Sequence, residues 1–213
     1  MISAFVALAA FKPSRALVWI QRMEGMYAHL HSYRDTGYQE GGDESIKFET
    51  AFVAPGKMYF RYSAGGDTDY FCAPGVMGFP AAQPEIGMQA ATRPTWMATA
   101  SINGKAEKNS LELEIAGFTG ISRSTAYNVP TMLFPSYAGR RFDELTNPVV
   151  AGTQRVNGVE CMIVDGKESK LWIGKQNLAL YKVKDKDIDN SMTVYKPELN
   201  PKISDKVFVF RQP

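Results

Sequence analysis

Histidine and cysteine are scarce in this chain, and their scarcity limits the chemistry that it can perform. The 213 residues include two histidines and two cysteines. His29 and His31 stand two apart at an expected helix end, so they point in different directions and do not form a metal-binding pair. With so little histidine, no Ser-His-Asp or Cys-His set stands out. We therefore predict no catalytic residue, no metal site and no cofactor. We expect a protein that is not an enzyme, and an enzyme of unknown type is the least favoured alternative.

Cys72 and Cys161 are too few for a disulfide framework. They leave two alternatives open. In an exported protein they can form a single bridge. In the other case both are buried thiols that pack as small hydrophobic side chains.

Neither sign of charge is in excess. Lys and Arg number 24 against 22 Asp and Glu, so the formal net charge is +2. The sequence has no basic run of the kind that nucleic-acid binding needs. Nucleic acid is therefore excluded as an expected partner.

Long hydrophobic runs are missing as well. Residues 2–11 form a largely apolar run of ten residues, whereas a membrane-spanning helix needs roughly 20. Pro13 interrupts the run, and the small residues Ser14 and Ala16 suit a signal peptidase. We expect residues 1–16 to be a secretory leader cut near Ala16, and residues 17–213 to form a single domain. An ordered N-terminal helix or strand is the alternative.

Residues 17–30 have the pattern of an amphipathic helix. Apolar side chains recur there at steps of three and four, which places them on one face. Gly25 in the middle costs about 1 kcal/mol relative to Ala, so tertiary packing has to hold the helix in place.

Alternating residues predict strands over much of the remaining chain. Residues 46–54 and 57–64 form a hairpin turned at Pro55-Gly56, and one face of that hairpin is apolar and aromatic. Residues 155–183 form an antiparallel meander with strands at 159–164, 170–173 and 178–183. We also expect strands at residues 36–40, 95–102, 191–196 and 206–211, and short helices at residues 110–118 and 140–146. Residues 124–134 are expected to be helical or irregular. This order predicts an antiparallel α+β domain with its helices on one side of the sheet.

Several segments together resemble the LolA-like superfamily of bacterial envelope proteins. The expected first helix and strand read ALVWIQRMEGMYAHLHSYRDTGY, and the first hairpin reads FETAFVAPGKMYFRY. Later strands of the family are similar to RVNGVECMIV, KLWIGKQNLALYKV and SDKVFVFRQP. The resemblance covers most of residues 17–64 and 109–213, whereas residues 65–108 match poorly. The middle of the chain looks like an uncharacterised branch of the superfamily rather than the lipoprotein carrier itself.

The resemblance implies a strongly curved antiparallel sheet, an incomplete β-barrel, with helices covering its concave side. It also implies a monomeric periplasmic protein without cofactors, which holds lipid or lipoprotein acyl chains on the concave face and can contact the membrane surface. The residues expected to line this apolar cavity are Phe48, Phe52, Met58, Phe60, Tyr62, Leu171, Ile173, Phe208 and Phe210. For the last four residues, it stays open which of the two alternating sets of side chains on each strand faces the cavity. The alternative is an envelope sensor or adaptor that binds another protein through residues 65–108.

Overall fold

The computed structural model describes residues 14–41, 46–55, 57–64, 68–73, 76–78, 88–93, 96–100, 106–109, 128–134, 142–187 and 190–208. Their helices are α1 (Arg15–Ala28), α3 (Asn128–Leu133) and two 3-10 helices, η1 (Phe142–Glu144) and η2 (Asp205–Phe208). The first eight strands are β1 (Ser32–Glu40), β2 (Ile46–Val53), β3 (Lys57–Ala64), β4 (Thr68–Ala73), β5 (Val76–Gly78), β6 (Met88–Arg93), β7 (Trp96–Ala100) and β8 (Ala106–Asn109). The remaining strands are β9 (Val149–Val156), β10 (Val159–Asp165), β11 (Ser169–Gly174), β12 (Leu180–Asp185) and β13 (Met192–Leu199).

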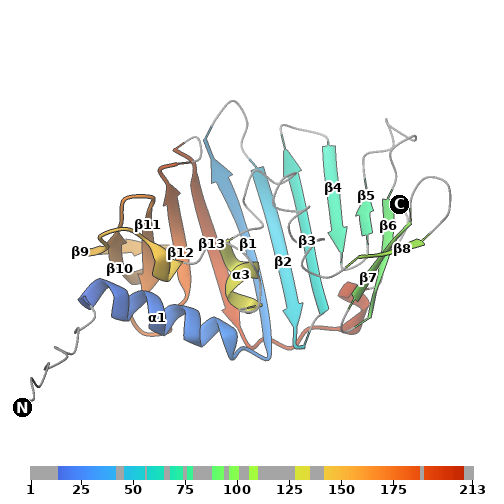
Figure 1. Cartoon of the computed structure of the whole chain (residues 1–213), viewed down its shortest axis with the longest axis horizontal. Helices are drawn as coiled ribbons and strands as arrows, with labels where there is room; N and C mark the ends of the chain where they lie inside the picture. Colours follow the sequence, from blue (N-terminus) through green and yellow to red (C-terminus); the bar gives the residue numbers. More distant parts are fainter. Residues whose placement is uncertain are drawn as a thin grey trace, which may run out of the picture.

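Within these ranges the strands form one antiparallel sheet of thirteen, in the order β8-β7-β6-β5-β4-β3-β2-β1-β13-β12-β11-β10-β9. β1 pairs with β2 on one side and with β13 on the other, so segments far apart in the sequence meet inside the sheet. The sheet curves around α1, and α3 lies on the same concave side near β1 and β2 (Figure 1). The terminal strands β8 and β9 do not pair with each other. The predicted fold class, a strongly curved antiparallel sheet with helices on its concave side, is confirmed.

The long helix α1 lies where the apolar periodicity predicts it, shifted by two residues toward the N-terminus. Ser14 caps it, because its Oγ accepts a hydrogen bond from the Leu17 N–H at 3.2 Å. The buried stripe, which packs into the sheet, consists of Ala16, Ile20, Met23 and Tyr27. Ala16 is thus part of the helix at the position where we expect the leader to end. Residues 1–13 lie outside the described residues, and the leader stays a prediction.

Buried side chains cover both faces of the sheet near α1. The concave core joins α1 and α3 to residues of β1, β2, β3, β10, β11, β12 and β13. Leu171 and Ile173 belong to it, whereas Trp172 between them points to the opposite face. There Trp172 packs with Cys161 and donates a hydrogen bond from Nε1 to Gln154 Oε1 at 2.8 Å.

Cys161 is a free, buried thiol. Burial raises its pKa to about 11. Of the two alternatives for the cysteines, the buried thiol is therefore the one found at Cys161. The side chain of Cys72 lies outside the described side chains.

Some of the expected elements differ from the structure or lie outside it. Residues 206–208 belong to the 3-10 helix η2 instead of a closing strand, because Ser204 folds the chain back: its carbonyl accepts from the Val207 N–H at 3.0 Å. Residues 209–211 and the helix expected at 110–118 lie outside the described residues. Within the expected segments 124–134 and 140–146, the described residues form α3 and η1.

Two glycines give opposite predictions for substitution by alanine. A Cβ on Gly25 of α1 would meet no atom within 4 Å among the described residues, whereas a Cβ on Gly37 of β1 would overlap the Val194 carbonyl oxygen and the Phe48 ring. We expect Gly25→Ala to raise the free energy of unfolding by about 1 kcal/mol. We expect Gly37→Ala to lower it by about 1–3 kcal/mol through overpacking. Urea unfolding of both variants tests this, and destabilisation by Gly25→Ala would contradict the open environment of Gly25.

Candidate functional site

The concave core gathers five of the nine residues expected to line a cavity. They are at most 5% exposed, and they are Phe48, Phe52, Met58, Leu171 and Ile173. In the arrangement seen here they are covered by the protein's own side chains from α1 and α3. A ligand can therefore reach them only if one of the covering elements moves.

Of the other four expected residues, Phe208 is the one whose side chain the structure describes. Phe60 and Tyr62 continue β3 beyond Met58, with Cα partners Thr50 and Phe48 on β2, but their side chains and Phe210 lie outside the described residues. Phe208 ends η2, half-buried and separate from the concave core. η2 itself lies beside β3, where Lys57 Nζ pairs with Asp205 Oδ1 at 2.7 Å.

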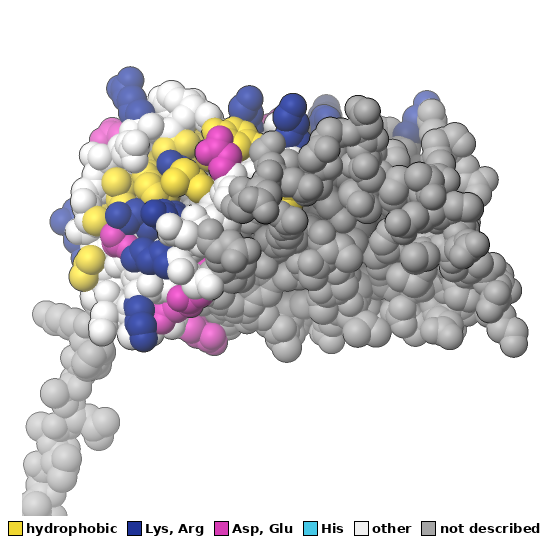
Figure 2. All heavy atoms as spheres, turned by 90° about the horizontal axis from the view of Figure 1, so that it is seen from above, with side chains coloured by type: hydrophobic (Ala, Val, Ile, Leu, Met, Phe, Trp, Pro, Cys, Tyr) yellow, Lys and Arg dark blue, Asp and Glu magenta, His cyan; other side chains and the backbone are white. Residues whose placement is uncertain are grey.

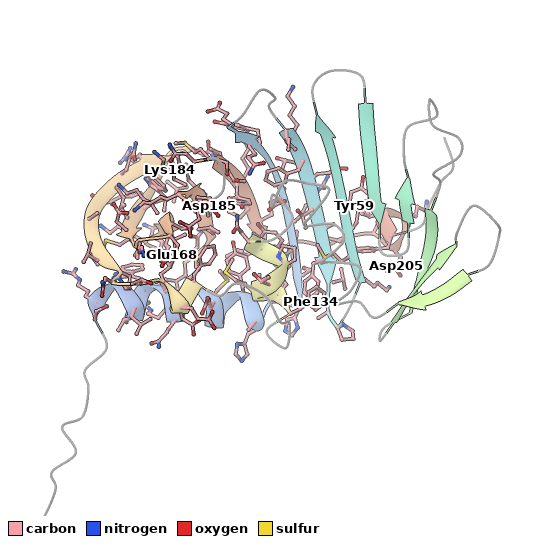
Figure 3. All side chains as sticks on the ribbon, turned by 45° about the horizontal axis from the view of Figure 1, so that its top comes forward. Tyr59, Phe134, Glu168, Lys184, Asp185 and Asp205 are labelled. Atoms are coloured by element: carbon pink, nitrogen blue, oxygen red, sulfur yellow. The ribbon has the colours of Figure 1, made fainter. Side chains whose placement is uncertain are left out.

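Residues 128–134, α3 and the residue after it, form a plug on the concave side. Every one of these residues is buried. At one end Asn128 Nδ2 donates a hydrogen bond to Tyr195 Oη on β13 at 2.9 Å. At the other end the Phe134 ring meets the Phe52 ring of β2 edge to face, with centroids 5.2 Å apart. Figure 3 shows Phe134 on the side of the sheet that α1 covers. The plug is thus fastened to two strands of the sheet.

A groove separates the plug from α1. Its volume is about 330 Å³, which falls in the usual range for small-molecule sites. The residues that line it are Gln21, Glu24, Gly25 and Ala28 of α1, Thr131 and Met132 of α3, and Asp143. Glu24 Oε1 accepts hydrogen bonds from the N–H groups of Phe142 at 2.8 Å and Asp143 at 3.3 Å, which holds η1 at one end of the groove.

A buried polar cluster lies in the same concave core. Tyr33 Oη donates to Asp35 Oδ2 at 2.6 Å, and the Tyr27 ring packs edge to face on Tyr33 at 5.4 Å. Tyr27 Oη in turn accepts from the Leu180 N–H at 3.1 Å. Burial raises the pKa of Asp35 to about 6 against the lowering effect of the Tyr33 and Thr50 hydroxyls. It also raises the pKa values of Tyr27, Tyr33 and Tyr195.

The sequence patterns do not predict this cluster. Asp35 follows the first helix in a stretch that we expect only to lead into a strand. The signal that could have revealed it is the alternation of side chains along β1. Tyr33, Asp35 and Gln39 are buried and alternate with exposed residues, so they lie on the inward face of the strand. A carboxyl group at an inward position of a strand is unusual enough to mark a candidate site.

Charged side chains elsewhere are paired across neighbouring strands. Asp165 accepts from Lys170 at 2.7 Å and from Lys186 at 2.6 Å, and Glu160 accepts from Lys175 at 2.8 Å. Exposed pairs of this kind contribute about 0–1 kcal/mol each. Both signs of charge and hydrophobic side chains are mixed over the described part of the face in Figure 2. The surface described there therefore has no field of a single sign.

The described residues offer neither a cluster of metal ligands nor a helix that could span a membrane. No group of three or more His, Cys, Asp or Glu side chains in that part of the chain is placed to hold a metal ion. None of the helices in the same ranges combines the length and the apolar composition needed to cross a membrane.

Solved structures of similar architecture share little sequence with this chain. The MucA–MucB complex from Pseudomonas aeruginosa contains a chain that is similar at 10% identity with a TM-score of 0.48, over 93% of this chain and 62% of that one. This chain therefore spans less than two thirds of its length. LprF from Mycobacterium bovis is similar at 13% identity and a TM-score of 0.46, over 91% and 97% of the two chains. A LolA superfamily protein from Nitrosomonas europaea is similar at 12% identity and a TM-score of 0.30, over 92% and 97%.

Like these structures, the described part of this chain is built around one antiparallel sheet, whose terminal strands β8 and β9 stay unpaired with each other. Neither a protein-family model nor a curated protein matches the chain. At identities this low the structural likeness concerns the fold alone. The function therefore has to be argued from the residues of this chain.

Proposed function

We propose that this protein is a non-enzymatic binding protein of the bacterial periplasm, which holds lipid or lipoprotein acyl chains on the apolar concave face of its sheet. The observation that carries the proposal is the plug, a short and wholly buried segment on that face, separated from α1 by a groove of about 330 Å³. A ligand that enters through the groove would displace the plug and take its place against β2 and β3.

The energetics favour such an exchange. A helix of six residues is too short to be stable alone, so α3 keeps its form only through packing. An acyl chain gains about 0.8 kcal/mol for each buried methylene, or roughly 10 kcal/mol for twelve of them, before the costs of association. A chain of ordinary length can therefore replace the contacts that Val129, Met132 and Leu133 make in the core.

The proposed ligand-binding face starts at the part of β2 that the plug covers. It runs from Phe48 and Phe52 to Met58 on β3. We propose that Phe60 and Tyr62 extend it, because they continue the parity of Met58 along the same strand. Contributions of Leu171, Ile173, Phe208 and Phe210 stay predictions, and the first two would require α1 to move as well.

Native mass spectrometry tests the proposal on protein exported to a bacterial periplasm and purified without detergent. We expect a stoichiometric adduct of lipid mass. Gly25→Trp places an indole ring at the groove, at a position where an added Cβ meets no atom within 4 Å among the described residues. It is expected to reduce the retained lipid at least fivefold, which corresponds to about 1 kcal/mol of lost apolar burial for the ligand. Val18→Trp is the matched control, since Val18 is exposed on the same helix and does not line the groove, and it should retain lipid like the wild type.

A lipid-free mass with several lipid sources would overturn the carrier function. The result would favour the envelope adaptor, whose expected contact surface, residues 65–108, has its side chains outside the described residues. Pull-down with the full chain and with a chain altered in residues 65–108 would then be the next measurement. Equal lipid loss in both tryptophan variants would instead show that the groove is not the entrance.

A further inference from the structure

Asp35 has an oxygen atom without a partner in the middle of the concave core. The residue is 1% exposed, and its Oδ1 makes no hydrogen bond within the part of the chain that the structure describes. Buried polar atoms nearly always have a partner, so each exception calls for an explanation. Its neighbours in register are Thr50 on β2 and Pro197 on β13, which places it between the two strands that hold the plug.

The groups around Asp35 do not neutralise a negative charge. The Tyr33 hydroxyl and the hydroxyl and N–H of Thr50 donate toward the carboxyl group and lower its pKa, but they carry no charge, and Glu49 on β2 acts in the opposite direction. Asp35 in turn acts on Tyr27 of α1 and Tyr195 of β13. No ion pair joins Asp35 to a Lys or Arg among the described residues. On α3, the Asn128 amide donates to Tyr195 instead.

We propose that Asp35 is the polar anchor of the ligand site, whose Oδ1 accepts a hydrogen bond from an uncharged O–H or N–H group at the polar end of a bound acyl chain. This inference rests on the proposed function and names its ligand class: acyl lipids with a neutral donor, such as the hydroxyl of an acylglycerol or the N–H of an acyl amide. A neutral donor fits this core better than an ammonium group, which would have to lose its water as well.

The route to Asp35 follows from the plug. When residues 128–134 leave the concave face, Asn128 releases Tyr195 and the space next to β1, β2 and β13 becomes available. The polar end of the ligand then reaches the carboxylate opposite Thr50, and its acyl chain extends from there along β2 past one of the two flanking rings, Phe48 or Phe52. A single ligand thus covers the apolar side chains and donates a hydrogen bond to Asp35 Oδ1.

The protonation state of Asp35 makes the inference testable by pH. Because burial raises its pKa to about 6, the side chain only accepts hydrogen bonds at pH 7.5. As a carboxylic acid at pH 5 it also donates one. At pH 7.5 the protein should therefore bind a ligand with a hydrogen-bond donor more tightly than a ligand with acceptors alone. The ratio of the two affinities should be smaller at pH 5.

Binding of three lipids with the same twelve-carbon acyl chain to the delipidated full chain provides the test. Monolauroylglycerol offers O–H donors, lauramide offers N–H donors and methyl laurate has neither. At pH 7.5 we expect the wild type to bind the first two at least about tenfold more tightly than the ester, as for a hydrogen bond to a charged group. Asp35→Leu should bind all three with similar affinity, and Asp35→Asn should lose the pH dependence. Glu40→Gln removes an exposed carboxylate from the same strand and should behave like the wild type.

The outcomes separate this inference from the function on which it rests. Equal affinity of the wild type for the three lipids, or an unchanged preference in Asp35→Leu, overturns the anchor role and leaves the carrier function intact. Preference for lauramide alone or monolauroylglycerol alone supports the anchor and identifies the donor. Failure of the wild type to bind any of the three overturns both.

Discussion

Asp35→Asn is expected to flatten the pH dependence of stability between pH 4 and pH 7.5. In the folded protein the pKa of Asp35 is raised from its ordinary value of 3.8 to about 6 by burial. Folding therefore takes up a proton between these two values. An ionised Asp35 costs the folded state about 3 kcal/mol above pH 6, at about 1.4 kcal/mol for each pH unit between the two values. The cost disappears as the pH falls toward 3.8.

The wild type should accordingly gain stability from this residue on acidification, whereas Asp35→Asn should not. Urea unfolding at pH 4.5, 6 and 7.5, followed by tryptophan fluorescence, measures the free energy of unfolding of both proteins. We expect the wild type to gain about 2 kcal/mol relative to Asp35→Asn when the pH falls from 7.5 to 4.5. Glu40→Gln, on the exposed face of β1, controls for loss of a carboxylate. Parallel pH profiles of the wild type and Asp35→Asn would show that Asp35 titrates normally in the folded protein.

Local patterns account for the elements that the sequence predicts well. The β2–β3 hairpin and the β10–β12 meander are found because alternation and turn residues act over a few positions. α1 is found for the same reason at helical spacing. β9 is not foreseen before Arg155, since seven of its eight residues are not buried and show no alternation. An edge strand that packs little has little pattern to reveal.

Local sequence patterns predict only part of the candidate site. The apolar face of β2 and β3 is visible in the sequence, and Phe48, Phe52 and Met58 do converge in one core. The segment that covers them is not visible, because the contact between Phe52 and Phe134 joins elements that only the fold brings together. The same holds for Asp35, whose burial depends on α1, β2 and β13 at once. Residues that share a face can be read locally, whereas what packs against that face cannot.

Phe134→Ala is expected to speed lipid uptake by at least about 100-fold. Removing a buried phenylalanine ring costs about 3–5 kcal/mol, and at this position the cost falls on the contact between the plug and Phe52. The plug leaves the sheet before the rest of the protein unfolds in the proposed mechanism. The loss of free energy then falls on the closed state alone, and the fraction of molecules with the plug displaced rises accordingly. Stopped-flow uptake of a fluorescent fatty acid by the delipidated protein measures the rate.

Trp172→Ala separates plug opening from general loosening. Trp172 is 5% exposed and lies in the core on the opposite face of the sheet, so its truncation should lower the free energy of unfolding by a similar 3–5 kcal/mol. Because it leaves the contacts of residues 128–134 in place, the uptake rate should stay near that of the wild type. Equal acceleration in both variants would mean that lipid enters through global loosening of the sheet. An unchanged rate in Phe134→Ala would place the entrance away from the plug, since only an element on the ligand's path can gate its entry.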